Sequence, residues 1–367
     1  MPNGSSCQLA TGLQSRIRIE GKVAVSHPIR KILFVLKDRH QYGSYGYVSY
    51  GLLNSASFVA IELEKFPGVE TKVVSVIDGN SIDREVYAYK PTHVIIEALW
   101  ATPTKMAELM NRYPLIKWIV RLHSKPTFLA NEGIAFEWIG DLVELSKATG
   151  MLTVSTNNEE FSRYLSSIYN VEFSYSPNIY PEPFRFHVRK FPEAAIIHIG
   201  LFGALRPMKN HVTQAIAAID FAKSIGKYLK FHINSDRVEQ RGGEVLKNLR
   251  ALFADMPNAE LVEHPWVDHG DFIKLVGEMD LGLQVSVSET YNIVAADFVS
   301  MGIPILVCPD IEFTPSVYQV NPTSLDAIKQ GLLTLYTLDN PVLTFYAKWR
   351  LAQSNKRAVK AWRQVIV

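Results

Sequence analysis

The sequence predicts an α/β protein of two Rossmann-like, doubly wound domains that face a central cleft. The chain has 367 residues, which is too long for one ordinary hydrophobic core and suits two domains. Strand-like apolar runs alternate with helix-like segments almost throughout, which is typical of βαβ units and of a parallel sheet covered on both faces. A proline-rich stretch at residues 176–193 interrupts this alternation and indicates a connection between the domains.

The first predicted domain spans residues 29–180. Its expected strands are the apolar runs at 31–37, 71–77, 92–99, 116–124 and 151–156. Amphipathic or capped segments such as 54–66 and 157–169 lie between these runs and predict helices. The preceding residues, 1–28, lack the basic start and the apolar stretch of a signal peptide, so we expect a flexible lead-in there.

A hinge linker at 181–194 leads to the second predicted domain, at 195–344. The apolar runs of this domain lie at 195–203, 229–235, 259–266, 281–286 and 303–308. Open α/β sheets bind ligands outside the carboxyl ends of their strands, and with two such domains the cleft between them is the expected site. Motifs that follow these strands are therefore the candidates for chemistry.

The final segment, 345–367, predicts a basic helix. It carries six cations, and aromatic residues share the segment: Lys348, Arg350, Lys356, Arg357, Lys360 and Arg363, with Tyr346, Trp349 and Trp362 among the aromatic residues. Such a helix can contact an anionic membrane surface or nucleic acid. The alternative is a terminal helix that docks its aromatic residues while its lysines stay solvated. One arrangement has this helix cross back to the N-terminal domain.

Composition and charge exclude several classes of protein. Hydrophobic residues make up 47% and charged residues 20%, as in a folded protein, and the net charge of +2 gives no global field for nucleic acid. No apolar run is long enough to span a membrane. The two cysteines, Cys7 and Cys308, form neither a disulfide framework nor a zinc site, and two reduced thiols suit the cytoplasm. We therefore expect a cytoplasmic protein that is soluble or peripherally associated with a membrane.

One motif follows the expected strand at 281–286. Glu289 lies in the loop that enters a helix, Asp297 lies about two turns further on, and Gly302 and Pro304 end the helix. The exposed N–H groups of the helix start form a positive end that suits a phosphate or a sugar oxygen; they belong to Thr290, Tyr291, Asn292 and Ile293. A loop carboxylate beside them can accept hydrogen bonds from hydroxyls of the same ligand. The alternative is that Glu289 only complements the helix dipole and that Asp297 is a surface residue.

A second motif follows the strand at 195–203. The strand ends in Gly200 and Gly203, and a loop with Arg206 and Lys209 opens a helix. Glycines allow close backbone approach, and two cations beside a helix start suit a diphosphate. The pattern is neither a P-loop nor the dinucleotide fingerprint. Taken alone, it is also explained by a solvated loop.

Together the two motifs resemble those of the retaining GT-B glycosyltransferases of family 4. In that family a Glu, seven residues and a second Glu lead into A-x-x-x-G-x-P-V, and here Glu289, seven residues and Asp297 lead into "FVSMGIPIL". The family also opens its C-terminal domain with G-R-L-x-x-x-K-G, where this chain has "GALRPMKN" with Lys209 at the lysine. The resemblance covers about residues 195–310, and the N-terminal half only in outline.

The resemblance implies a GT-B fold with an N-terminal acceptor domain and a C-terminal donor domain. Within the donor domain, Lys209 would contact the donor diphosphate, with Arg206 and Gly203 in the same phosphate-binding loop. Ala204 stands where the family usually has an arginine, and Arg206, two residues on, is the candidate to replace it.

The same resemblance assigns roles around the first motif. Glu289 would hold hydroxyls of the donor sugar, beside the amides of residues 290–293. Asp297 would bond the ribose diol, although it is one methylene shorter than the usual Glu, and Asn292 replaces a common glycine. His123, which follows the apolar part of the run at 116–124, would face the reacting sugar; a satisfied structural histidine is the alternative.

The implied function is transfer of a sugar, with retention of configuration, from a nucleotide-diphosphate sugar to an unidentified acceptor. We expect a UDP- or GDP-sugar as co-substrate and a glycan, lipid, protein or modified nucleic acid as acceptor. His232, His264 and His269 give no metal spacing, so we expect a metal-independent protein without a permanently bound cofactor. Two alternatives stay open: a catalytically inactive GT-B protein that binds sugar nucleotides or glycans, and a nucleotide-sugar epimerase on the same fold.

Overall fold

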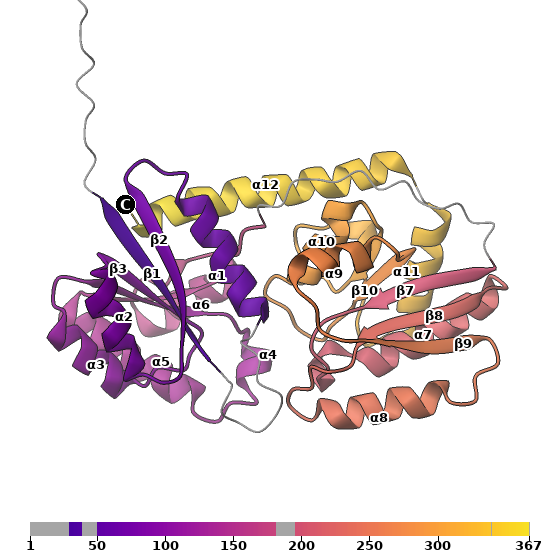
Figure 1. Ribbon diagram of the computed structural model, residues 1–367, viewed down its shortest axis with the longest axis horizontal. Helices are drawn as coiled ribbons and strands as arrows, with labels where there is room; N and C mark the ends of the chain where they lie inside the picture. Colours follow the sequence, from indigo (N-terminus) through magenta and orange to yellow (C-terminus); the bar gives the residue numbers. More distant parts are fainter. Residues whose placement is uncertain (1–28, 39–49, 181–194, 339, 367) are drawn as a thin grey trace, which may run out of the picture.

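The computed structural model describes residues 29–38, 50–180, 195–338 and 340–366. The expected lead-in at 1–28 and the expected hinge linker at 181–194 lie outside the described residues. Figure 1 shows two α/β units beside each other, with one long helix lying along both of them.

The first sheet is parallel throughout and, in the described residues, has six strands in the order β2-β1-β3-β4-β5-β6. These strands are β1 (Arg30–Lys37), β2 (Val69–Val76), β3 (His93–Glu97), β4 (Lys117–Leu122), β5 (Leu152–Thr156) and β6 (Ser174–Tyr175). The strand order reverses between β1 and β3, which places the ligand-binding edge of this sheet at the carboxyl ends of its central strands.

Helices cover both faces of this sheet. On one face lie α1 (Tyr50–Leu63) and the last helix, α12 (Pro341–Ile366), whose Trp362 packs against Phe34 of β1 with ring centroids 6.2 Å apart. The other face is covered by α2 (Ser81–Tyr89), α3 (Pro103–Arg112), the short α4 (Pro126–Leu129), α5 (Ala135–Thr149) and α6 (Glu159–Tyr169). Both faces are therefore apolar, as a doubly wound sheet requires.

The second sheet is also parallel and, among the described residues, has five strands in the order β11-β10-β7-β8-β9. Its strands are β7 (Ile196–Leu201), β8 (Tyr228–Asn234), β9 (Ala259–His264), β10 (Leu281–Gln284) and β11 (Ile305–Val307). Its helices are α7 (His211–Ser224), α8 (Gly242–Phe253), α9 (His269–Val276), α10 (Ile293–Met301) and α11 (Leu325–Thr337). The order reverses between β7 and β10, and the two sequence motifs follow these two strands. The prediction of two parallel, doubly wound sheets is confirmed.

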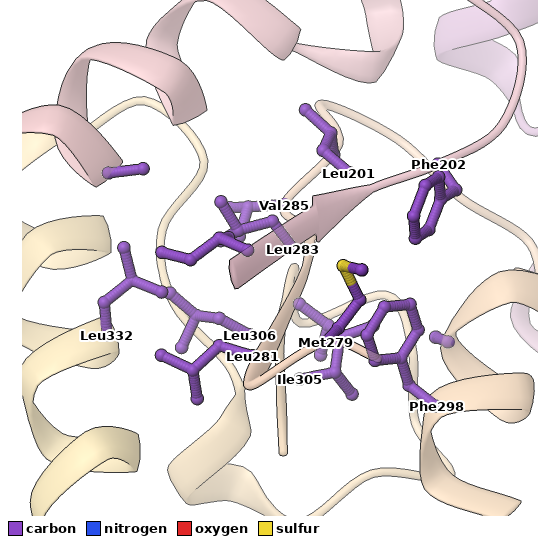
Figure 2. Packing of buried hydrophobic residues seen from close by; sticks show 14 of the residues in the cluster. Leu201, Phe202, Met279, Leu281, Leu283, Val285, Phe298, Ile305, Leu306 and Leu332 are labelled. Atoms are coloured by element: carbon purple, nitrogen blue, oxygen red, sulfur yellow. The ribbon is translucent and has the colours of Figure 1, made fainter. Parts of the chain in front are cut away.

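Two glycines of neighbouring strands hold α10 close to the second sheet. Gly200 of β7 and Gly282 of β10 are register partners. A Cβ atom added at Gly282 would lie 2.6 Å from the Phe298 ring, and one added at Gly200 would lie 3.1 Å from the same ring. Phe298 is fully buried beside Phe202 and Met279, as Figure 2 shows. Because glycine has no side chain, these two positions leave the space that the Phe298 ring occupies, and so they set the distance between α10 and the strands.

The helix α12 connects the two units. It begins beside α10 of the second unit and ends against α1 and β6 of the first unit (Figure 1). No helix in the described part of the chain combines the length and the apolar character that crossing a bilayer requires.

Candidate functional site

The loop after β7 leads directly to Lys209. Gly203 has a φ of 111°, a conformation that favours glycine, and its N–H donates to Asn234 Oδ1 at 3.0 Å. The loop then passes Arg206 and forms a 3-10 turn at Pro207–Lys209, after which α7 begins. The backbone thus carries both predicted cations past the ends of β7 and β8.

The loops after β7 and β10 are bonded to each other. The N–H of Val287 donates to the carbonyl oxygen of Met208 at 2.9 Å. The N–H of Val285 donates to Gln214 Oε1 of α7 at 2.7 Å. As a result, the two sequence motifs, which are about 80 residues apart in the chain, face each other across the switch point of the sheet.

An ion pair between Lys209 and Glu289 joins these loops. Only 14% of the lysine side chain and 9% of the glutamate side chain are exposed. Burial raises the pKa of Glu289, but Lys209 and Arg206 outweigh it and hold that pKa below its ordinary value. Glu289 is therefore a carboxylate at neutral pH, in the position where the sequence predicts contact with the donor sugar.

Arg206 lies at the edge of the same site. Its guanidinium is 5.0 Å from the centre of the Phe128 ring in α4, and its Nη1 is 3.6 Å from Glu239 Oε2. Its Nε is buried and has no hydrogen-bond partner among the described residues. A buried, unsatisfied donor on a cation suits an anionic ligand.

The helix α10 begins at Ile293, directly after its cap. Asn292 Oδ1 accepts the N–H of Ala295 at 2.9 Å, and Asn292 Nδ2 donates to Gln284 Oε1 at 2.7 Å. Asn292 adopts a φ of 77°, where glycine is the easier residue, so these two bonds help to hold it there. Within the described residues, the backbone N–H groups of residues 290–293 have no hydrogen-bond acceptor. They form the positive end that the sequence predicts beside Glu289.

The side chain of Tyr291 is part of the hydrophobic core of the second unit. Its ring packs against Phe313 with centroids 4.9 Å apart, and the side chain is 8% exposed. Its buried hydroxyl has no partner in the part of the chain that the structure describes. Only its backbone, not its side chain, was predicted to act in the site.

Asp297 lies buried between the two units and is only 1% exposed, so the alternative that it is a surface residue is wrong. Its Oδ1 accepts hydrogen bonds from the Tyr180 hydroxyl and from His269 Nε2, each at 2.7 Å. The Tyr180 and His269 rings both pack against Phe58 of α1. The contact between Asp297 and a ribose stays a prediction, and in this conformation Oδ1 already has these two donors.

His123 follows β4 and is held from both sides. Its Nε2 lies in hydrogen-bond contact with the Glu97 carboxylate. Its Nδ1 is 3.4 Å from Asn157 Nδ2, which also donates to Thr290 Oγ1 at 3.0 Å. Burial and the neighbouring Arg121 lower the pKa of His123, so the imidazole is neutral at neutral pH and donates from Nε2. These bonds favour a positioned histidine, and a contact with the reacting sugar stays a prediction.

A buried ion pair lies under His123. Arg121 and Glu97 are both fully buried, and Arg121 Nη1 is 3.1 Å from each carboxylate oxygen of Glu97. Arg121 also donates to Ser176 O at 2.8 Å and to Asn178 Oδ1 at 2.6 Å. Burial raises the pKa of Glu97, but the Arg121 charge and the hydrogen bond from His123 outweigh it and lower that pKa. The charged pair therefore fixes the carboxylate that orients the histidine.

Two further contacts beside Glu289 join the two units. Thr290 Oγ1 donates to the carbonyl oxygen of His123 at 3.1 Å. Asp310 accepts the N–H of Glu289 through Oδ2 at 2.9 Å and pairs with Lys125 Nζ through Oδ1 at 2.9 Å. The loop that carries Glu289 is thus bonded to the segment that follows β4, which places His123 and Glu289 on the two sides of one interface.

A separate hollow of about 340 Å³ lies at the carboxyl ends of β2 and β3. Trp100, Thr102 and Lys105 line it, among others, and none of its lining residues belongs to the two motifs. Trp100 Nε1 donates to the carbonyl oxygen of Glu97 at 3.0 Å, so the hollow adjoins the network around His123. In the described residues, no group of three or more His, Cys, Asp or Glu side chains is placed to hold a metal ion.

Sequence reasoning missed six polar residues of this interface: Glu97, Arg121, Asn157, Tyr180, His269 and Asp310. For the buried pair a signal was present, since an ionisable residue within or at the end of an apolar strand must find a partner when it is buried. The other contacts join segments that are distant in the sequence, and no local pattern indicates them.

No protein-family profile and no curated protein sequence matches the chain. Solved structures do match. An α,α-trehalose-phosphate synthase from Burkholderia vietnamiensis has a TM-score of 0.62 at 10% identity, over 92% of this chain and 98% of that chain. Sucrose-phosphate synthase from Thermosynechococcus elongatus gives 0.62 at 11% identity, over 92% and 98%. HepE from Anabaena, solved in complex with UDP-glucose, gives 0.61 at 12% identity, over 91% and 98%. The GT-B fold is therefore confirmed, and identities this low show the fold alone.

Proposed function

We propose that this protein is a retaining, family 4-like glycosyltransferase that moves a sugar from a nucleotide-diphosphate sugar to an acceptor. The observation that carries the proposal is the ion pair of Lys209 and Glu289 at the switch point of the second sheet, beside the N–H groups of residues 290–293, which have no acceptor among the described residues. A diphosphate needs cations and N–H donors, and a sugar needs a carboxylate that accepts from its hydroxyls. This site offers both within one pair of loops.

Negative charge builds on the leaving diphosphate as the bond to the sugar breaks. Lys209, Arg206 and the N-terminus of α10 are the groups that stabilise this charge, with no covalent nucleophile from the protein. A bound diphosphate competes with Glu289 for Lys209 Nζ, which releases carboxylate oxygens for the sugar hydroxyls. Arg206 Nε has no hydrogen-bond partner among the described residues, which supports Arg206 as the phosphate ligand in place of the family's usual arginine, at whose position this chain has Ala204.

The first unit supplies the acceptor side in this proposal. His123 stands across the interface from Glu289, through the Thr290 bond to its carbonyl oxygen. The hollow beside Trp100 supports an acceptor site on the same edge of the first sheet, because an aromatic wall with neighbouring hydroxyl and ammonium groups suits a sugar. Whether the acceptor is a glycan, a lipid, a protein or a modified nucleic acid is decided by these N-terminal loops.

The specific rival is an inactive GT-B protein that binds sugar nucleotides without transfer. Asp297 favours it, because this shortened acid is buried with Tyr180 and His269 as its donors. Binding of a donor without turnover in the presence of varied acceptors would support the rival. An epimerase would return an altered donor with no change in the acceptor. We further propose a cytoplasmic, metal-independent enzyme, for which turnover is unchanged by a chelator.

Substitution of Lys209 tests the mechanism. Removing one such electrostatic contact typically lowers a rate by about 10²–10³, so we expect Lys209→Ala to lose about that factor in turnover. The matched control is Lys274→Ala, because Lys274 of α9 has a side chain that is 77% exposed. The anomeric configuration of the product, followed by NMR, tests retention. Activity of Lys209→Ala within twofold of wild type would overturn the assignment of Lys209.

A further inference from the structure

The helix α12 presents a surface that the proposed transfer does not use. Its exposed apolar and aromatic residues follow the spacing i, i+3, i+4, i+7 and so share one face: Val342, Phe345, Tyr346 and Trp349, the α12 apolar patch. Their exposed fractions are 72%, 71%, 42% and 47%. The rings of Tyr346 and Trp349 stack on each other, with centroids 5.9 Å apart.

The same face continues as a basic stripe toward the end of the helix. Its members are all exposed: Lys356, Arg357, Lys360 and Arg363, the α12 basic stripe. Lys356 lies seven residues after Trp349, and Lys360 lies four residues after that, which keeps them on the face of the patch. The helix contains no Asp or Glu. Its buried residues, among them Leu351, Ala358 and Trp362, lie on the opposite side of the helix.

One alternative from the sequence has the aromatic residues of this helix dock on the protein while its lysines stay solvated. The structure confirms only part of it. Trp362 is docked and fully buried, whereas Tyr346 and Trp349 are exposed. Lys348, by contrast, is buried, and burial lowers its pKa. The packing of α12 against the two units therefore does not account for the exposed aromatic residues.

We propose that this face of α12 docks on a bilayer that carries anionic headgroups, with the helix lying in the plane of the interface. Tyrosine and tryptophan favour the headgroup level, and apolar side chains such as Val342 and Phe345 insert below it. The basic stripe is attracted to the negative surface. Figure 1 shows α12 lying along both units, and the exposed residues of the patch and the stripe lie on the side of the helix that does not pack against them. Duplex nucleic acid would use the cations but gives the exposed Val342 and Phe345 no apolar partner.

Vesicle flotation with the full chain tests this proposal without any sugar donor, so its outcome is independent of the proposed transfer. We expect binding to phosphatidylcholine vesicles that contain phosphatidylglycerol, little binding to pure phosphatidylcholine vesicles, and weaker binding as salt rises. Each cation near the surface contributes about fivefold in affinity, so Lys356→Ala/Lys360→Ala should weaken binding about 25-fold. Phe345→Ala/Trp349→Ala should weaken it about tenfold or more, because it removes buried apolar area.

Two controls match these variants. Lys247→Ala/Lys274→Ala removes the same charge from α8 and α9, and Tyr87→Ala removes an aromatic ring that is 73% exposed on α2. Both should bind as wild type does. The proposal is overturned by equal binding to neutral and anionic vesicles, or by patch and stripe variants that bind like the controls. Binding to duplex DNA but not to vesicles would also overturn the proposal. So would a dimer of this protein that Phe345→Ala/Trp349→Ala converts to monomers.

Discussion

The buried ion pair of Glu97 and Arg121 supports a quantitative prediction about stability. Both side chains are fully buried, so Glu97→Gln leaves a guanidinium charge without its anion in a region of low polarity. Removing one partner of such a pair costs about 3–5 kcal/mol in unfolding free energy. Arg121→Met should cost at least as much, because it strands the Glu97 charge and also removes the donors that Ser176 and Asn178 use.

The double variant Glu97→Gln/Arg121→Met separates the charge from the packing. Both charges are gone, and what is lost is the hydrogen bonding to Ser176 and Asn178, about 1–3 kcal/mol. We therefore expect the double variant to be more stable than either single variant, which is a coupling of several kcal/mol.

Urea unfolding measures these changes through tryptophan fluorescence, because Trp118 and Trp362 are fully buried in the same unit. The surface pair of Arg112 and Asp83, 2.9 Å apart, is the matched control, and Arg112→Met should cost less than about 1 kcal/mol. Additive effects of the two single substitutions, or a cost of Glu97→Gln as small as that of the control, would show that the two buried charges do not stabilise each other.

Three further predictions follow from the packing and the interface. Gly282→Ala should destabilise the second unit by about 1–3 kcal/mol in urea unfolding, because its Cβ would lie 2.6 Å from the Phe298 ring. An unchanged urea midpoint would show that the Phe298 ring does not need the space left by the glycine. Thr290→Val should lower turnover about tenfold, because it removes the hydrogen bonds that join the units, whereas Thr290→Ser keeps the hydroxyl and should stay near wild type. His211 is 2% exposed, its two ring nitrogens have no partner among the described residues, and burial lowers its pKa to about 3. Below about pH 6.5 the imidazole binds a proton in the unfolded chain but not in the folded protein, so the free energy of unfolding should fall by about 2 kcal/mol between pH 7 and pH 5. His211→Leu should remove this part of the pH dependence of stability. The same pH dependence in the variant and in wild type would contradict this prediction.

Much of the fold could be predicted from the sequence because its signals are local. The alternation of apolar runs and helices indicates parallel sheets, and the loops after β7 and β10 carry the paired Lys209 and Glu289 at the switch point. Only the structure shows that the Asn292 side chain caps α10.

The remainder of the site depends on contacts between distant segments. Asp297 reads locally as a ribose ligand or a surface residue, but Tyr180, 117 positions away, donates to it. The same holds for the bond between Thr290 and His123, 167 positions apart. Such pairings are set by how the two units meet, and hydrophobic periodicity within one segment contains no information about that.

The most direct test of the proposed function is the release of nucleotide diphosphate from a panel of UDP-, GDP- and ADP-sugars. Wild type is compared with Glu289→Ala and with Glu278→Ala, a matched control at an exposed glutamate of the same unit. We predict slow hydrolysis of one donor class, which Glu289→Ala abolishes and Glu278→Ala retains. The proposed function would be contradicted if no nucleotide sugar bound at all, or if hydrolysis continued unchanged without Glu289.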